Sequence, residues 1–210
     1  MYNVLKIFYG DITMRRIKER NFFTIWMTGL PCSGKTTIAN ALNEKLNKLM
    51  THGRFVCLDG DDLRNKLNSD LGFTEEDRKE NLRRVGHISQ LFNDKRLNVL
   101  CSFVSPTESL REAALSNISN VYLVYVDCSA ETCAERDVKG MWAKAKSGEI
   151  SMFTGYSAPF DIPKNPDITV NTELFSIDQC VDQIIFFISS LGEDFELGMP
   201  LLTSLNSSML

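Results

Sequence analysis

One eight-residue stretch constrains the fold of this 210-residue chain more than any other feature. Residues 29–36, with the sequence Gly-Leu-Pro-Cys-Ser-Gly-Lys-Thr, match the pattern Gly-x-x-x-x-Gly-Lys-Ser/Thr of a phosphate-binding loop. An apolar, β-prone run precedes the loop at residues 23–28, and a helical pattern begins directly after it. Because such a loop needs a strand before it and a helix N-terminus after it, the chain predicts a nucleotide-binding α/β fold.

The loop residues themselves predict how a nucleotide is held. Backbone N–H groups and the positive end of the following helix dipole attract phosphate oxygens. Lys35 is expected to reach the β- and γ-phosphates, and the Thr36 hydroxyl is expected to ligate Mg²⁺. A chance glycine-rich turn is the alternative, and the strand and helix that flank the motif argue against it.

Strand-like and helical runs alternate along the rest of the chain. The strand-like runs are continuous in apolar residues, which is typical of parallel strands covered on both faces. They span residues 23–28, 54–58, 98–103, 121–126 and 168–170. Helices are expected at about residues 35–50, 75–95, 130–146 and 177–190, and in a stretch whose first turn holds Pro106. We therefore expect a three-layer α/β fold, with a parallel five-stranded sheet and helices on both faces.

Composition is that of an ordinary globular protein, with 43% hydrophobic and 24% charged residues. No apolar run approaches the ~20 residues that span a membrane, and the net charge of −4 argues against a nucleic-acid partner. Six scattered cysteines without a Cys-x-x-Cys pair favour reduced thiols and a cytoplasmic location. We expect a leader at residues 1–21, one domain at 22–190 and a flexible tail at 191–210.

Acidic residues follow the second predicted strand. Asp59 and Asp61 flank a glycine at the edge of the sheet where parallel-sheet proteins bind ligands. From such a turn, two carboxylates can approach a metal ion or a substrate hydroxyl. Arg64 follows, at a point where a short helix can form, and can neutralise a phosphate or a sulfate. An ordinary Asp-Gly turn accounts for the two aspartates equally well when they are taken alone.

The next predicted helix carries an arginine and an amide on one face. Arg78 and Asn81 are three residues apart, so their side chains project from the same side of the helix. A guanidinium and an amide suit an anion together with a polar base or ribose group, and a solvated charged face is the alternative. Residues 74–77 resemble a capping box in which Asp77 stands in place of the usual Glu or Gln.

Taken in order, these motifs resemble those of the adenylylsulfate kinase (APS kinase) family. The phosphate-binding loop is followed by Leu-Asp-Gly-Asp-Asp-x-Arg, Gly-Phe-x-x-Glu-Asp-Arg-x-Glu-Asn-x-Arg-Arg, Ser-Phe-Val-Ser-Pro and Arg-Asp-Val-Lys-Gly. The resemblance covers about residues 24–170. It implies a P-loop kinase that uses ATP and Mg²⁺ to phosphorylate the ribose 3′-hydroxyl of adenosine 5′-phosphosulfate (APS), giving PAPS. The family also implies a homodimer.

The resemblance implies a role for each residue that matches a motif. Lys35 and Asp61 would be catalytic, with Asp61 orienting or deprotonating the 3′-hydroxyl. Phe73 and Phe153 would sandwich the adenine of APS, because aromatic rings grip the face of a base. Residues 136–155, rich in Lys, Gly and Ser, are expected to form a mobile lid that excludes water.

The remaining implied contacts divide by ligand. The residues expected at ATP are Gly29, Pro31, Cys32, Ser33, Gly34, Lys35, Thr36, Thr37 and Arg136. Those expected at APS are Asp61, Arg64, Phe73, Arg78, Asn81, Val104, Ser105, Lys139 and Phe153. Those expected at Mg²⁺ are Thr36, Asp59 and Asp61.

Departures from the family pattern leave the acceptor open. Pro31-Cys32 stands in the loop where Ser-Gly is commoner, and Asp62 replaces a frequent Asn. A kinase of the same fold for another nucleotide-linked acceptor, such as a cytidylyl phosphoramidate of surface-polysaccharide synthesis, is therefore the second hypothesis. A nucleotide-dependent switch is the third. It is disfavoured because residues 65–68, Asn-Lys-Leu-Asn, lack the Asp of the Asn-Lys-x-Asp guanine motif.

Overall fold

The computed structural model describes residues 22–49 and 54–191. The expected leader and residues 192–210 of the expected tail lie outside the described part of the chain, so these boundaries stay predictions. None of the described helices combines the length and the hydropathy that a membrane crossing requires.

Five parallel strands form one sheet, which confirms the predicted parallel five-stranded sheet, and their order is β2-β3-β1-β4-β5. The strands are β1 (Thr24–Thr28), β2 (Phe55–Asp59), β3 (Asn98–Ser102), β4 (Val121–Asp127) and β5 (Ile168–Asn171). All five residues of β1 are buried, and Thr24 lies in register with Val99 of β3 and Val121 of β4. The carboxyl ends of the strands therefore meet at one edge, where the phosphate-binding loop begins.

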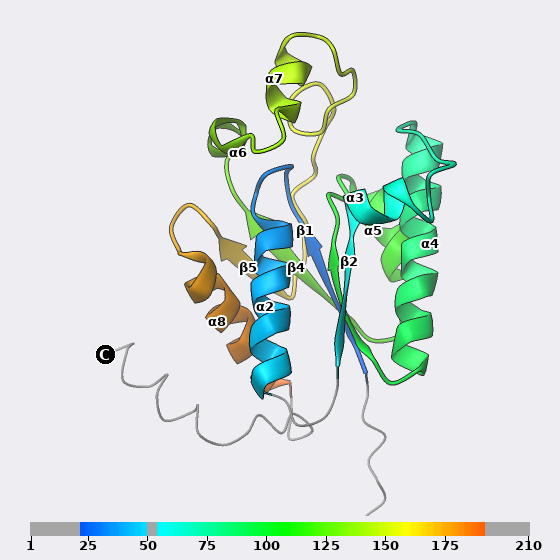
Figure 1. The fold of residues 1–210 in the computed structure, drawn as a ribbon, viewed down its shortest axis with the longest axis vertical. Coiled ribbons are helices and arrows are strands. Elements are labelled where there is room, and N and C mark those ends of the chain that lie inside the picture. The colour runs from blue at the N-terminus through cyan, green and yellow to red at the C-terminus, as the bar shows by residue number, and fades with distance from the viewer. Residues whose placement is uncertain (1–21, 50–53, 192–210) are drawn as a thin grey trace, which may run out of the picture.

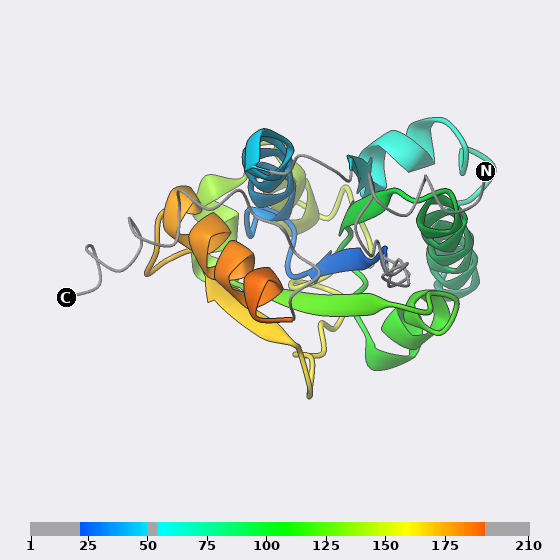
Figure 2. The ribbon, with the colours of Figure 1, turned by 90° about the horizontal axis from the view of Figure 1, so that it is seen from below.

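Helices cover both faces of the sheet, which confirms the three-layer architecture (Figures 1 and 2). The helices are α2 (Lys35–Leu49), α3 (Gly60–Asn65), α4 (Glu75–Asp94), α5 (Glu108–Leu115), α6 (Ala130–Arg136), α7 (Met141–Lys146) and α8 (Ile177–Ser190). Side chains alternate across the central strand. Ile25 and Met27 pack with α2 and α8 in one core cluster, whereas Trp26 packs with α4 and α5 in the other. Each such fully buried side chain contributes about 1.5–3 kcal/mol to stability.

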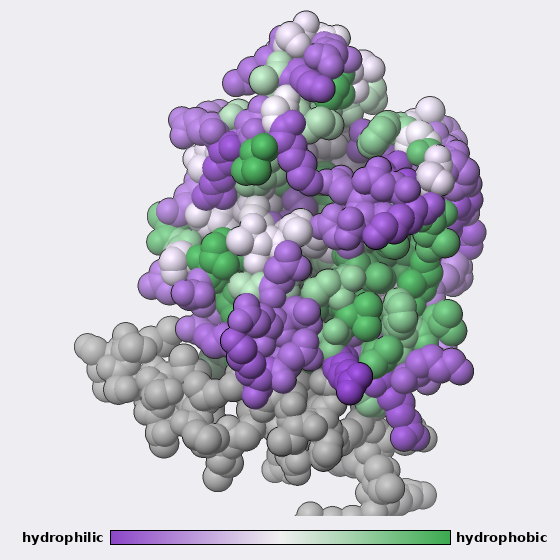
Figure 3. Space-filling model, in the orientation of Figure 1, coloured by the Kyte–Doolittle hydropathy of each residue, from purple (hydrophilic) through white to green (hydrophobic). Residues whose placement is uncertain are grey.

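The surface of the molecule differs between the two ends of the face seen in Figure 3. Hydrophilic residues cover α3, which lies at the carboxyl edge of the sheet, whereas apolar residues gather over the edge strand β2 and over α4 (Figures 1 and 3). The hydrophilic cover over α3 therefore lies where the predicted site residues are found.

The helix predicted at residues 130–146 was wrong, because the structure breaks it into α6 and α7. Asp137 ends α6, and its carboxylate accepts hydrogen bonds from the backbone N–H groups of Trp142 and Ala143 at 2.9 Å each. Gly140, at φ +67°, then starts α7. The side chain of Asp137 thus caps a new helix inside a stretch whose composition is helical throughout.

Two helix starts also differ in detail from the prediction. Pro106 precedes α5 instead of lying in its first turn, because Thr107 is the N-cap and its hydroxyl accepts from Leu110 N. Thr74 caps α4 as expected by accepting from Asp77 N at 3.1 Å. The Asp77 carboxylate does not complete the capping box, since it accepts from Gly72 N instead.

A close contact between α4 and α5 fixes the position of α4. A Cβ atom built on Gly86 of α4 would lie 2.3 Å from the carbonyl oxygen of Ala114 in α5. Only glycine allows the two backbones to approach this closely. Since α4 carries Arg78 and Asn81, this contact also sets the height of those side chains above the sheet.

We expect Gly86→Ala to destabilise the protein by about 1–3 kcal/mol, because the added methyl group forces the two helices apart. Urea unfolding measures the change. Lys79→Ala, an exposed position of the same helix, is the control and should shift stability by less than about 0.5 kcal/mol. A Gly86→Ala variant as stable as the unmodified protein would show that α4 is free to move away from α5.

Candidate active site

The phosphate-binding loop lies between β1 and α2, as its motif predicts. Gly29 is held so close to β4 that a Cβ atom there would lie 2.5 Å from the carbonyl oxygen of Val126. Cys32 has φ +67°, a left-handed conformation that costs a residue with a Cβ atom about 1–2 kcal/mol. Cys32 thus adopts the left-handed conformation of the loop although glycine is commoner at this position.

Contacts with α7 and with the end of β5 hold the outer side of this loop. Pro31 accepts a hydrogen bond at its carbonyl oxygen from Trp142 Nε1 at 3.3 Å. The carbonyl of Ser33 accepts from Thr172 Oγ1 at 2.9 Å. Arg136, a residue predicted at ATP, donates to the hydroxyl and carbonyl oxygens of Thr172 at 3.0 and 2.7 Å. Arg136 is therefore linked to the loop through Thr172.

Lys35 points back into the loop. Its ammonium donates to the carbonyl oxygens of Gly29 at 3.0 Å and Leu30 at 2.7 Å. Burial lowers the pKa of Lys35 to about 8, since the charged form has lost its hydration. Phosphate oxygens are better partners for such an ammonium than neutral carbonyls, because charge-assisted hydrogen bonds are roughly twice as strong.

A cluster of oxygen ligands joins the loop to the ends of β2 and β3. Asp59 Oδ2 accepts from Thr36 Oγ1 and from Ser102 Oγ, both at 2.7 Å, and the two hydroxyl oxygens lie 3.3 Å apart. Burial raises the pKa of Asp59, but these hydrogen bonds and those from the backbone of Asp61 and Asp62 outweigh it, so the net pKa lies below its ordinary value. The carboxylate is therefore ionised at neutral pH.

This cluster suits a hard divalent cation. Mg²⁺ prefers carboxylate, hydroxyl and phosphate oxygens and usually takes only one or two protein ligands. Across the described residues, no group of three His, Cys, Asp or Glu side chains converges on a metal site. A cation here would therefore depend on Thr36 and Asp59 together with oxygens of a bound nucleotide.

Asp61, the predicted catalytic carboxylate, starts α3 beside this cluster. Its backbone N–H donates to Asp59 Oδ1 at 2.9 Å, which makes Asp59 the N-cap of α3. The Asp61 side chain is exposed and forms an ion pair with Lys139, which lies between α6 and α7. The Asp61 carboxylate raises the pKa of Lys139. The structure thus brings a predicted lid residue onto the predicted catalytic residue.

Phe73, just before α4, contacts two arginines. The guanidinium groups of Arg64 and Arg78 lie 4.5 and 5.7 Å from the centre of its ring. Burial lowers the pKa of both arginines below their ordinary values. Arg78 also donates to the carbonyl oxygens of Phe73 and Met152, both at 3.0 Å. It therefore ties the start of α4 to the segment that follows α7.

The second predicted aromatic partner of adenine is buried in a small core of its own. The ring of Phe153 meets Trp142 edge-on, with 5.1 Å between ring centres. Phe153 is 8% exposed, whereas Phe73 is 63% exposed. The two rings therefore differ in environment, and their proposed roles stay predictions.

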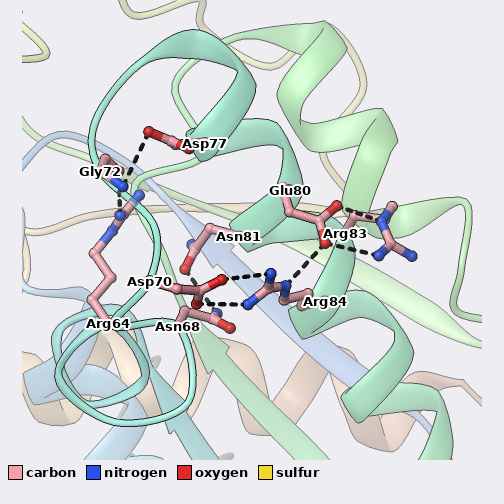
Figure 4. A network of polar contacts seen from close by, with 9 residues as sticks. All are labelled: Arg64, Asn68, Asp70, Gly72, Asp77, Glu80, Asn81, Arg83 and Arg84. Carbon is pink, nitrogen blue, oxygen red and sulfur yellow. Dashed lines mark hydrogen bonds and ion pairs between the residues drawn. The ribbon is translucent and has the colours of Figure 1, made fainter.

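Asn81 faces the turn between α3 and α4 (Figure 4). It is buried, and its Oδ1 accepts from Asn68 Nδ2 at 2.9 Å. Around it, Arg84 forms paired hydrogen bonds with Asp70 at 2.8 Å each, and Arg84 and Arg83 both contact Glu80. Arg64 donates to the carbonyl oxygen of Gly72 at 2.7 Å. Arg64 and Asn81, two of the predicted substrate residues, thus lie among polar contacts that join α3, α4 and the turn between them.

Val104 and Ser105 lie beyond the end of β3. Val104 accepts at its carbonyl oxygen from Thr28 Oγ1 at 2.8 Å. Ser105 is buried, with its hydroxyl accepting from Trp26 Nε1 at 3.1 Å and donating to Thr28 Oγ1 at 3.0 Å. These contacts anchor the segment to the central strand.

Three residues of the site carried no predicted role. Ser102 and Thr172 lie at and just after the ends of parallel strands, so the rule that singled out Asp59 could have found them too. Asn68 had no such signal, because its contact with Asn81 spans thirteen residues and depends on a turn.

The phosphate-binding loop lies between a strand and a helix, and its threonine donates a hydrogen bond to the Asp59 carboxylate. With the second carboxylate of Asp61 nearby, this arrangement is that of a P-loop kinase. Comparison with known proteins gives the family. Residues 21–171 match the family model described as adenylylsulphate kinase. The chain therefore belongs to the adenylylsulphate kinase family.

Individual relatives agree with the family model over most of the chain. An adenylyl-sulfate kinase of Clostridium kluyveri is 44% identical over 85% of this chain and 90% of its own length. One of Prochlorococcus marinus is 47% identical over 77% of this chain and 80% of its own. The solved APS kinase of Mycobacterium tuberculosis, in complex with AMPPNP and APS, is 38% identical, with a TM-score of 0.76 over 80% of this chain and 98% of that one.

We expect Arg78→Ala to release the segment after α7, because Arg78 supplies hydrogen bonds to Met152 and Thr154. Amide hydrogen exchange should accelerate roughly tenfold within residues 150–158, since local opening loses about one charged hydrogen bond. Arg83→Ala, which removes an exposed arginine paired with Glu80, is the control and should leave that segment unchanged. Equal protection in both variants would mean that the hydrogen bonds of Arg78 do not hold the segment.

Proposed function

We propose that the protein transfers the γ-phosphoryl group of ATP to the ribose 3′-hydroxyl of APS, giving PAPS and ADP. The observation that carries this proposal is the position of Asp59. One of its oxygens accepts from Thr36 of the phosphate-binding loop, and the other accepts from the backbone of Asp61. A single side chain thus joins the donor side of the site to the carboxylate proposed to face the acceptor. The Mycobacterium tuberculosis relative, described with AMPPNP and APS, supports the same pair of ligands.

On the donor side, the loop would hold the ATP phosphates by its backbone N–H groups. The Lys35 ammonium would leave the carbonyl oxygens of Gly29 and Leu30 for the β- and γ-phosphates. Phosphoryl transfer needs in-line positioning and charge neutralisation more than covalent chemistry from the protein. The buried ammonium supplies that neutralisation where water does not screen it.

Mg²⁺ would be held by Thr36 and Asp59, whose oxygen atoms already converge. When bound, it would supply positive charge that offsets the negative charge developing during phosphoryl transfer. Ser102 would keep Asp59 in place through its hydrogen bond to the same carboxylate oxygen. Asp61, also predicted at the metal, is turned toward Lys139 in this structure.

On the acceptor side, Asp61 would take the proton of the 3′-hydroxyl while the 3′-oxygen attacks the γ-phosphorus. The new bond joins the 3′-oxygen to phosphorus, the bond between the γ-phosphorus and the β,γ-bridging oxygen breaks, and ADP leaves with the electron pair. Arg64, Arg78 and Asn81 would hold the APS anion and its nucleoside. Assembly as a homodimer and a cytoplasmic location remain part of this proposal.

We expect purified protein to form PAPS from ATP and APS, and Lys35→Ala to lower kcat by about 10²–10³-fold because a charged donor to the transferring group is lost. Asp61→Ala should lower it by about 10²–10⁴-fold because the general base is lost. Chromatographic detection of PAPS is the measurement, with Lys79→Ala as a surface control. Turnover of a cytidine-linked acceptor without turnover of APS would contradict this proposal and support the second hypothesis, a kinase of the same fold for another nucleotide-linked acceptor.

We expect Asp59→Asn to raise the Mg²⁺ concentration needed for half-maximal activity by about tenfold or more, since the neutral amide is a weaker ligand and no longer orients Thr36. A Mg²⁺ titration at saturating ATP and APS measures the shift. Asp94→Asn, at the far end of α4, is the matched control. An unchanged Mg²⁺ requirement in Asp59→Asn would remove Asp59 from the metal site.

A further inference from the structure

Asn68 occupies a position that stability alone does not explain. It is fully buried in the turn between α3 and α4, and its Oδ1 has no hydrogen-bond partner among the described residues. Leaving a buried acceptor unpaired is unfavourable, and an aliphatic side chain of similar volume would avoid the cost. The use of asparagine here therefore depends on the other end of its amide.

That other end meets Asn81. Asn68 Nδ2 donates to Asn81 Oδ1 at 2.9 Å (Figure 4). The carbonyl end of the Asn81 amide is thereby engaged, whereas no described residue accepts a hydrogen bond from its Nδ2. If the Asn81 amide turned over, two NH₂ groups would face each other. Asn68 thus fixes the orientation of Asn81 so that an NH₂ group, which can only donate, is left for a ligand.

The turn fixes the backbone of Asn68 and so holds its side chain beside Asn81. Its backbone N–H donates to the carbonyl oxygen of Leu63 at 2.8 Å, and its carbonyl accepts from Leu71 at 3.1 Å. Two residues further on, Asp70 is gripped by the paired hydrogen bonds of Arg84. Asn68 is therefore anchored to α3 on one side and to α4 on the other, before any ligand arrives.

We propose that Asn68 is a positioning residue for the acceptor substrate, acting through Asn81. By holding the Asn81 carbonyl, it directs the Asn81 NH₂ group toward an acceptor atom of APS, either an oxygen of its anionic group or a ring nitrogen of its base. This inference rests on the proposed function of Asn81 as a substrate contact. It assigns Asn68 no contact of its own with substrate.

Two variants of Asn68 distinguish the effect of its hydrogen-bond donor from the effect of its packing. Asn68→Leu keeps the number and branching of the side-chain heavy atoms and relieves the unpaired Asn68 oxygen, but it removes the donor to Asn81 Oδ1. Asn68→Asp keeps the shape but replaces the donor with a carboxylate, which repels Asn81 Oδ1 and favours the reversed amide. We expect each to raise the KM for APS about tenfold, the factor given by one lost hydrogen bond of ~1.4 kcal/mol. The KM for ATP should change by less than twofold.

A double-mutant cycle then tests whether the effect passes through Asn81. Asn81→Ala should raise the KM for APS by about the same tenfold factor, since it removes the same hydrogen bond to substrate. In the Asn81→Ala background, Asn68→Leu and Asn68→Asp should each change that KM by less than twofold. Asn65→Ala, an exposed asparagine at the end of α3, is the matched control and should leave both KM values unchanged.

The outcomes distinguish this inference from the proposed function. Failure of the unmodified protein to turn over APS overturns the proposed function, and the inference that rests on it. Turnover with additive effects of the two positions overturns the inference alone, because Asn68 would then act independently of Asn81. A lower melting temperature with an unchanged KM for APS would show a purely structural role and overturn it as well. An unchanged KM for APS in Asn68→Asp would mean that Asn68 accepts a hydrogen bond from Asn81 and does not donate one, and it would also overturn the inference.

Discussion

The Asp59 carboxylate is the interaction on which the rest of the site depends. It accepts hydrogen bonds from the hydroxyl of Thr36, from the hydroxyl of Ser102 and from the backbone N–H group of Asp61 in the first turn of α3. These donors come from α2, β3 and α3, so one side chain sets the relative position of three elements. Its lowered pKa keeps it ionised at neutral pH, and the three elements therefore stay joined under the conditions in which a kinase works.

This convergence follows from how the sheet is built. β1 lies in the middle of the sheet and sends apolar side chains into two separate cores, which fixes its height relative to both helical layers. β2 and β3 end level with it, because Asp59 lies in register with Ser102 and Ser102 with Met27. Polar groups at the ends of these strands are thus brought together by packing that takes place further down the sheet.

The sequence predicts the elements better than it predicts their joints. Five parallel strands, the loop and the main helices follow from apolar runs and one motif, since these signals are local and repeated. The break at Asp137 does not follow, because a single carboxylate that caps the next helix outweighs the helical composition around it. Likewise, Asp59 was expected at a ligand, but its contact with Ser102 depends on strand register, and the Asn68–Asn81 pair depends on a turn.

The register of β1 has a consequence for how the chain is made. Its partners in the sheet are residues 99–102 of β3 and residues 121–125 of β4, so all of them lie far along the chain from β1. During synthesis the ribosome must therefore release β4 before the centre of the sheet can close. Until then β1, whose five residues are all buried in the folded protein, lacks a partner strand on one side. Non-local pairing of this kind slows folding and exposes chains to aggregation. The nascent chain is thus most prone to aggregation after the phosphate-binding loop has been synthesised and before the sheet around β1 is complete.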